Sequence, residues 1–91
     1  MQKKCTTTFV YILLCNDNTL YTGWTTNMKR RLSEHNAGKG SRYTRTRTPV
    51  IVVFTEEHMN KSSAMKRESS IKNLSRSKKL QLIESHQNIF C

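Results

Sequence analysis

The chain has 91 residues and a mass of 10.6 kDa, the size of one small domain, which excludes two separate hydrophobic cores. Apolar residues make up 35% of it, and sixteen lysines and arginines against six acidic residues give a net charge of +10. That charge predicts a polyanionic partner, with nucleic acid first and an anionic membrane surface second. The alternative is a basic surface that only confers solubility.

Nothing in the sequence predicts export or a membrane span. It has no run of about 18 apolar residues of the kind that crosses a bilayer. The apolar run after Lys3 and Lys4 is short for a signal peptide, and no small-residue cleavage site follows it. Three widely spaced cysteines without a CxxC pair favour neither a zinc ribbon nor a disulfide framework. We therefore expect a cytoplasmic protein (nuclear in a eukaryotic or viral setting), not secreted, without a membrane partner and monomeric by default.

The first part of the chain predicts a hairpin followed by a helix. The apolar run 9–15 is typical of a strand that is covered on both faces and lies at the centre of its sheet. After the turn residues 16–18, the segment 19–23 predicts a second, antiparallel strand. Thr25, Thr26 and Asn27 are candidates to cap a helix that runs to about residue 37, before Gly38.

The second part predicts a basic loop over 38–48, a β-branched strand over 50–54 and helices over 62–74 and 78–85. The order β-β-α-β-α-α predicts an α+β fold, a small three-stranded, mostly antiparallel sheet flanked by about three helices. The domain is expected to span 9–85, between tails at 1–8 and 86–91.

Positive charge is concentrated in two blocks. Residues 29–47 contain seven basic residues and one acid, and residues 61–79 repeat that count, so each block carries +6. If both blocks fold onto one side, they form a single groove for nucleic-acid phosphates. The basic residues that we expect to contact nucleic acid are Lys29, Arg30, Arg42, Arg45, Lys66 and Lys72.

Glu68 is the only acid in the second block, and it falls between Ala64 and Met65 on the helical wheel, with Ile71 beyond Ala64. A carboxylate in an apolar stripe is unfavourable unless a positive group neutralises it. Mg²⁺ often binds one or two carboxylates together with waters and substrate phosphate. The pattern leaves open whether Glu68 binds a metal or forms an ion pair with Arg31 or a neighbouring lysine.

Tyr11 and Tyr21 lie on the two strands of the predicted hairpin. Taken singly, each is most simply a half-buried strand aromatic. Gly23 follows Tyr21 closely, and a glycine at a strand end often marks close approach of a ligand to the backbone. Trp24 either stacks on a base or packs at the hairpin exit.

Arg31 and His35 are one helical turn apart, so they share a face. Arg31 could brace a phosphate, and His35 could hydrogen-bond a phosphate oxygen or a water. The alternative is an ordinary basic helix face exposed to solvent.

Four segments in this order resemble the GIY-YIG nuclease domain. They are Val10-Tyr11-Ile12, Tyr21-Thr22-Gly23, the KRRLSEH segment at 29–35 and the AMKRE segment at 64–68. The resemblance covers roughly residues 9–84 and is strongest to the small, uncharacterised members that consist of this domain alone. Three features depart from the family: the first motif lacks its glycine, Trp24 stands where excision-repair relatives usually have lysine, and an asparagine is missing. That asparagine, which many relatives carry after the glutamate helix, has no clear counterpart.

The resemblance implies metal-dependent hydrolysis of a phosphodiester in DNA, with one Mg²⁺ or Mn²⁺ ion bound weakly until substrate arrives. It implies that Tyr11 and Tyr21 are the motif tyrosines, one of which helps to deprotonate the attacking water. Arg31 would contact the scissile phosphate, His35 would be the position that is His or Tyr in relatives, and Glu68 would be the single metal ligand. Gly23 would let the backbone lie close to the site. The alternative function is a nucleic-acid-binding module with the same fold that has lost turnover.

Overall fold

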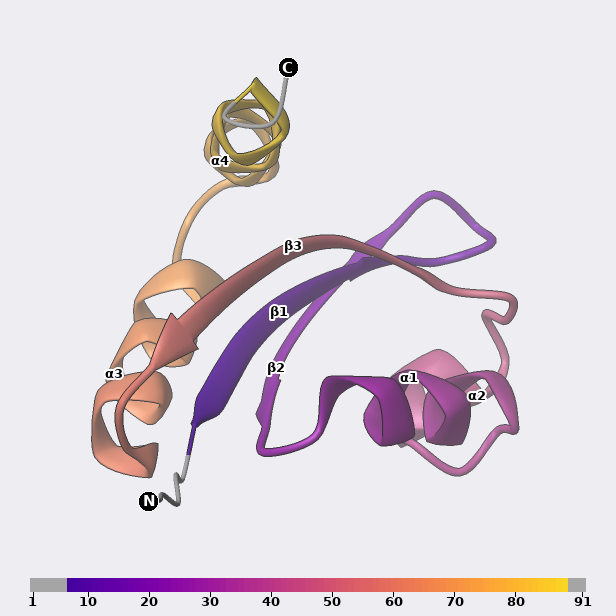
Figure 1. Cartoon of the computed structure of the whole chain (residues 1–91). Helices are drawn as coiled ribbons and strands as arrows, with labels where there is room; N and C mark the ends of the chain where they lie inside the picture. Colours follow the sequence, from indigo (N-terminus) through magenta and orange to yellow (C-terminus); the bar gives the residue numbers. More distant parts are fainter. Residues whose placement is uncertain (1–6, 89–91) are drawn as a thin grey trace.

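The structure, a computed structural model of the chain, describes residues 7–88 (Figure 1). Its elements are β1 (Thr8–Leu14), β2 (Leu20–Thr25), α1 (Met28–Asn36), α2 (Arg42–Arg45), β3 (Ile51–His58), α3 (Lys61–Lys72) and α4 (Arg76–Asn88). The predicted α+β fold is confirmed, with one short helix, α2, in the segment that was expected to be a loop. None of the helices in this part of the chain is long and apolar enough to cross a membrane.

The sheet is antiparallel throughout and has the order β2-β1-β3, so the apolar first strand is central as predicted. In the hairpin between β1 and β2, Asn18 adopts a left-handed backbone (φ 70°), which asparagine tolerates better than most residues. The register of the hairpin pairs Tyr11 with Gly23. This pairing determines where the Tyr11 ring lies.

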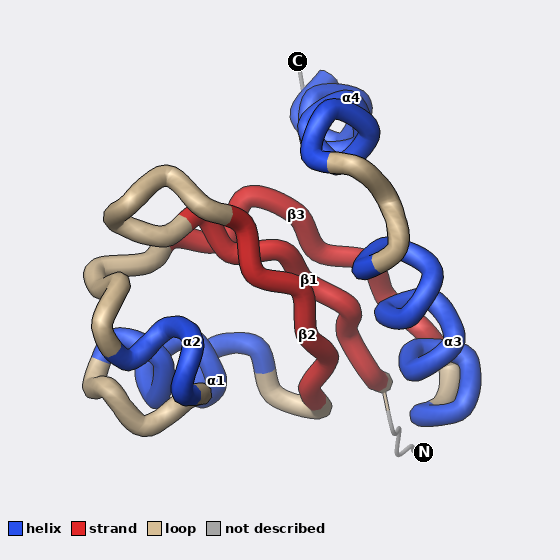
Figure 2. Tube along the Cα trace, turned by 180° about the vertical axis from the view of Figure 1, so that it is seen from behind, coloured by secondary structure: helices blue, strands red, loops and turns tan. Residues whose placement is uncertain are grey.

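Side chains of β1 alternate between two apolar clusters, one on each face of the sheet. Helix α3 covers one face and α1 with α2 the other, as Figures 1 and 2 both show. The cluster on the α3 side consists of Val10, Ile12, Phe54, Ala64, Ile71 and Ile83. The cluster on the α1 side consists of Tyr11, Leu13, Cys15 and Val50. Because each fully buried aliphatic side chain contributes about 1.5–3 kcal/mol, both faces help to hold β1 in place.

Several boundaries differ from the predicted ones. Strand β3 continues to His58, because its polar end still pairs with β1 as far as Thr8. Helix α4 continues to residue 88 and so includes part of the predicted C-terminal tail. Strand β1 begins at Thr8, inside the predicted N-terminal tail. Residues 1–6 and 89–91, with Cys5 and Cys91, lie outside the described residues.

A polar cluster fixes α3 to the end of β3. Oε1 of Glu56 is 2.9 Å from Nε of Arg67 and 2.7 Å from Nε2 of His58, while Nδ1 of His58 is 2.7 Å from Oγ of Ser63. Burial alone would raise the pKa of Glu56, but hydrogen bonds from His58 and Arg67 outweigh it and lower the pKa. The cluster therefore fixes the orientation of the helix that carries Glu68, the residue after Arg67.

Candidate active site

The candidate site is built around Tyr11, whose ring crosses the edge strand β2 at Gly23. A Cβ atom at Gly23 would lie 2.6 Å from the hydroxyl oxygen of Tyr11 and 2.8 Å from its Cζ, closer than any side chain allows. Glycine is therefore required here for space: it lets the central-strand tyrosine reach over its neighbour. Although Tyr11 is only 1% exposed, its hydroxyl has polar partners.

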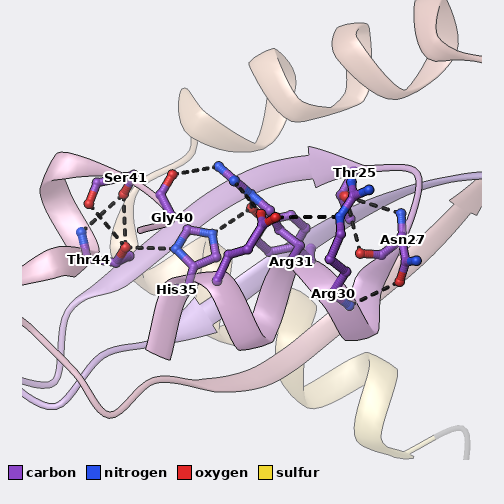
Figure 3. Close-up of polar contacts among 10 residues, drawn as sticks. Thr25, Asn27, Arg30, Arg31, His35, Gly40, Ser41 and Thr44 are labelled. Carbon is purple, nitrogen blue, oxygen red and sulfur yellow. Dashed lines mark hydrogen bonds and ion pairs between the residues drawn. The ribbon is translucent and has the colours of Figure 1, made fainter. Parts of the chain in front are cut away.

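His35 is the first of these partners. Its Nε2 is 2.9 Å from the Tyr11 hydroxyl, and the residue is fully buried on the inner side of α1 (Figure 3). The His35 ring has no exposed surface, so it can influence the site only through the side chains that it contacts, of which Tyr11 is one. This differs from the direct phosphate or water contact that the helix spacing suggested.

The other ring nitrogen of His35 contacts α2. Its Nδ1 is 2.7 Å from Oγ1 of Thr44, which is also fully buried and lies 3.0 Å from Oγ of Ser41 (Figure 3). Ser41 is the N-cap of α2 and accepts the backbone N–H of Thr44 through its side chain. With the Thr44 hydroxyl proton directed at Ser41, Thr44 accepts the Nδ1–H of His35. We assign this tautomer from the hydrogen-bond network, and it leaves Nε2 to accept the proton of Tyr11.

Arg31 is the second partner of Tyr11. Its Nε donates to the Tyr11 hydroxyl at 3.4 Å, while its two terminal nitrogens donate to Glu34 Oε1 at 3.0 Å and to the Gly40 carbonyl at 2.7 Å. Three contacts, from β1, from α1 and from the loop before α2, therefore orient the guanidinium plane. The hydrogen bond to Tyr11 raises the pKa of Arg31, so its positive charge is present at any physiological pH.

Burial and nearby charges shift the pKa values of Tyr11 and His35 in opposite directions. Burial raises the pKa of Tyr11, and although Arg31 opposes that shift, the negative charge of Glu68 adds to it. Burial, together with the charge of Arg31, lowers the pKa of His35 to about 4. At neutral pH the tyrosine is therefore protonated and the histidine uncharged.

Tyr21 lies beside this pair but is more exposed. Its ring is edge-on to His35, with centroids 5.3 Å apart, and stacks on Tyr43 at 5.9 Å. Arg47 covers the Tyr43 ring at 4.0 Å and is itself bound to Asp17 at 2.8 Å. This stack buttresses the second motif tyrosine from the α2 side.

Glu68 is 20% exposed, and its Oε2 is 3.5 Å from Nζ of Lys72. The apolar stripe around it is narrower than predicted, because Ala64 and Ile71 are buried but Met65 is 50% exposed. Arg31 pairs with Glu34 instead of Glu68. Among residues 7–88 no three His, Cys, Asp or Glu side chains cluster as a metal site, so Glu68 offers one carboxylate and substrate would have to supply further ligands.

A cleft of about 270 Å³ opens where β2 ends, between α1 and the start of α3. Asn27 caps α1 by accepting the backbone N–H of Arg30 at 3.0 Å (Figure 3), and this cap stabilises the first turn of the helix, which carries Arg30. The residues that line the cleft are Trp24, Thr25, Thr26, Arg30, Arg31 and Lys61. It therefore joins two arginines of the first basic block with a lysine of the second.

The remaining predicted nucleic-acid contacts lie on exposed helix surfaces. Lys29 lies on the first turn of α1, Arg42 and Arg45 lie on α2, and Lys66 and Lys72 lie on α3. Because α2 and α3 are on opposite sides of the sheet (Figures 1 and 2), these side chains do not share one helix face. The cleft is where the two blocks meet.

Sequence reasoning missed Gly40, Ser41, Thr44 and Lys61. Gly40 abuts the His35 ring so closely that any side chain there would overlap it. A serine followed three residues later by a threonine, both in a polar loop, signals at most a helix cap. Their contact with a histidine nine residues upstream depends on tertiary structure.

A model of the GIY-YIG catalytic domain matches residues 7–81. The chain belongs to the GIY-YIG family. UPF0213 protein SH2523 from Staphylococcus haemolyticus is 55% identical over 76 residues, which cover 84% of this chain and 93% of that protein. A UPF0213 protein from Natronomonas pharaonis is 59% identical over 75 residues, covering 82% and 88%. The solution NMR structure of EF2693 from E. faecalis has a TM-score of 0.61 at 41% identity, covering 93% of this chain and 90% of that one.

The GIY-YIG domain belongs to a superfamily of nucleases and implies a nucleic-acid substrate in general. Membership confirms the resemblance and the small single-domain form. The names of the relatives state no activity, so the reaction has to be argued from the residues of this GIY-YIG domain.

Proposed function

We propose that this protein is a divalent-metal-dependent endonuclease that hydrolyses phosphodiester bonds in DNA. The observation that carries the proposal is the buried hydroxyl of Tyr11, which lies 2.9 Å from Nε2 of His35 and 3.4 Å from Nε of Arg31. The GIY-YIG domain and the net charge of +10 support the same reading.

Tyr11 can act as a hydrogen-bond acceptor for the attacking water. Its proton is donated to His35, and one of its two lone pairs accepts the Nε–H of Arg31. One lone pair remains, which can accept a proton of a water that approaches from the Arg31 side. The neutral state of His35, whose pKa is lowered to about 4 mainly by burial, supports this arrangement near neutral pH.

Arg31 can hold the scissile phosphate while it positions Tyr11. A guanidinium has five N–H donors, of which three are used by Tyr11, Glu34 and Gly40. The remaining donors can bind phosphate oxygens from the wall of the cleft. One side chain would then bring the phosphate and the tyrosine that orients the water together.

Glu68 is the residue that would hold Mg²⁺ or Mn²⁺. A divalent cation held by Glu68 would supply charge that offsets the phosphate, and it would offset the contribution of Glu68 to the raised pKa of Tyr11. The single carboxylate fits an ion that binds weakly before substrate. Lys72, 3.5 Å from Glu68, would compete with that ion for the carboxylate.

A module that binds nucleic acid without cleaving it is the alternative. Binding requires only exposed basic side chains, and it gives no reason to bury tyrosine, histidine and threonine in one hydrogen-bonded network. That network favours the nuclease.

The proposal is tested by incubating labelled single-stranded, duplex and flap DNA with the pure protein in Mg²⁺, Mn²⁺ or EDTA. We expect internal cleavage of at least one substrate with either metal and none in EDTA. Arg31→Gln, prepared identically, should lose cleavage, whereas Arg76→Gln, an equal loss of charge on α4, should retain it. Binding of DNA without cleavage of any substrate under all conditions would favour the alternative.

A further inference from the structure

We infer that the cleft between α1 and α3 binds one unpaired nucleotide of a DNA strand, next to the phosphate that is cleaved. In this arrangement the base lies against Trp24, and an adjoining phosphate is bound by Arg30 and Lys61. The inference rests on the proposed function, because the nucleotide belongs to the strand whose phosphate Arg31 contacts. It adds to that function a substrate class, DNA with an unpaired nucleotide at the site of cleavage.

The cleft combines the two kinds of side chain that single-stranded nucleic acid requires. Trp24 is half-buried: part of it packs against the apolar cluster on the α3 side, and part lines the cleft. Aromatic side chains stack on unpaired bases of any sequence, and basic side chains beside them bind the backbone. Thr25 and Thr26 complete the wall, and none of the described residues that line it is acidic.

The basic side chains come from two different elements. Arg30 is on the first turn of α1, and its side chain is 58% exposed, with Glu34 3.6 Å away. Lys61 is the first residue of α3 and is exposed, and the positive end of that helix dipole adds to its charge. An anion in the cleft is therefore attracted from both sides.

Size and position favour a single nucleotide over a duplex. At about 270 Å³, the cleft is slightly below the range of typical small-ligand pockets, about 300–1,000 Å³. A base can reach Trp24 only when it is unstacked from its strand, which is least costly when it has no pairing partner. A larger hollow of about 640 Å³ lies along α4, but Arg76 and Glu84 line it with opposite charges and none of its residues belongs to the site.

Arg31 connects the cleft to the reacting groups. The same side chain lines the cleft and donates to the Tyr11 hydroxyl. A nucleotide in the cleft would thus place the adjoining phosphate beside the residue that orients the water. The strand would be aligned by contacts that are independent of its base sequence.

The fluorescence of Trp24 provides a direct test, because it is the only tryptophan of the chain. The probes are fluorescein-labelled (dT)₈ and a blunt hairpin duplex, mixed with wild-type protein in EDTA so that no cleavage occurs. Fluorescein anisotropy measures total binding, and unlabelled copies of the same DNA measure the tryptophan signal. We expect (dT)₈ to quench Trp24 as it binds, and the duplex to bind without comparable quenching.

Two variants separate charge from stacking. Lys61→Gln should raise the Kd for (dT)₈ about fivefold at 0.1 M salt and reduce the log–log salt slope by about 0.7, as the loss of one phosphate contact on a single strand predicts. Lys78→Gln, an exposed lysine on α4, removes the same charge outside the cleft and should change neither quantity by as much. Trp24→Leu should raise the Kd about fivefold or more without changing the slope.

The outcomes distinguish this inference from the proposed function. Binding of (dT)₈ without a change in Trp24 fluorescence, equal quenching by duplex, or equal effects of Lys61→Gln and Lys78→Gln would overturn the assignment of the cleft and leave the nuclease proposal standing. Failure of both probes to bind by anisotropy would overturn both. If Trp24→Leu does not fold, the comparison of the two lysine variants decides.

Discussion

The hydroxyl of Tyr11 lies 2.9 Å from Nε2 of His35, and both residues are buried between the sheet and α1. A buried polar pair is stable only when its hydrogen bonds are complete, and here Arg31 and Thr44 complete them. Tyr11 and His35 therefore link Arg31, which lines the cleft, to Thr44 on the short helix α2. Each link can be tested separately.

The first test is Tyr11→Phe, which removes the hydroxyl and retains the ring. We expect cleavage to fall by about 10²-fold or more, because the attacking water loses the hydrogen-bond acceptor that orients it. Stability should fall by only about 1 kcal/mol, the net contribution of a typical hydrogen bond. Initial rates on labelled DNA and urea unfolding measure the two effects. Tyr43→Phe, the same change at a more exposed ring, is the control and should change neither by as much.

Thr44 tests whether the tautomer of His35 matters. Thr44→Val keeps the shape but removes the acceptor for Nδ1–H, so the buried donor is left without a partner at a cost of about 1–3 kcal/mol. We also expect slower cleavage. Without Thr44 to accept its Nδ1–H, the His35 ring rotates or changes tautomer, and its Nε2 then no longer accepts the proton of Tyr11. Thr44→Ser restores the hydroxyl and should recover the rate. If valine and serine variants cleave equally well, Thr44 serves packing alone.

The comparison of sequence and structure shows which features local patterns encode. The unbroken apolar run of β1 predicts a central strand because only a strand covered on both faces needs it, and both clusters confirm it. The polar end of β3 was missed because Glu56 and His58 are stabilised by contacts with α3 that no alternation reveals. For the same reason the sequence indicates Tyr11 but not Thr44, whose role depends on where α2 lies.

His35 predicts a pH dependence of stability. Its pKa is lowered from 6.5 to about 4 in the folded protein, mainly by burial and also by Arg31. Between these values the unfolded chain binds a proton that the folded one does not, so stability falls as the pH falls. We expect a loss of about 2 kcal/mol between pH 7 and 5. Urea unfolding of wild type and His35→Gln measures it, and the variant should lack most of this slope. An unchanged slope in the variant would mean that another group titrates.

Gly23 tests the close approach of Tyr11 to β2. A methyl group there would lie 2.6 Å from the Tyr11 hydroxyl oxygen, and the ring cannot move freely because His35 and Arg31 hold it. Gly23→Ala should therefore destabilise the protein by about 1–3 kcal/mol, as overpacking does, and reduce cleavage. In a Gly23→Ala/Tyr11→Phe double variant the overlapping oxygen is absent. The stability loss of the double variant should therefore be smaller than the sum of the losses in the two single variants. Simple additivity, measured by urea unfolding, would show that the ring adjusts without strain.

Glu68 tests the proposed metal site independently of cleavage. Mn²⁺ is paramagnetic and broadens NMR signals near where it binds, and we expect the first signals to broaden to be those around Glu68. Glu56 is the natural competitor, but its Oε1 already binds Arg67 and His58, so it should respond only at higher Mn²⁺.

Glu68→Gln keeps the shape of the side chain and removes its charge, so it should abolish the selective broadening. It should also reduce cleavage by orders of magnitude, because metal assistance contributes several kcal/mol and about 1.4 kcal/mol is tenfold in rate. Lys72→Met removes the competing ammonium 3.5 Å away and should produce broadening at lower Mn²⁺ than wild type. DNA affinity in EDTA should stay the same or rise in Glu68→Gln, because a negative charge is lost from a basic surface. Broadening centred on Glu56 and Glu57 in wild type would place the metal elsewhere, and a Glu68→Gln variant that unfolds would identify the ion pair with Lys72 as structural.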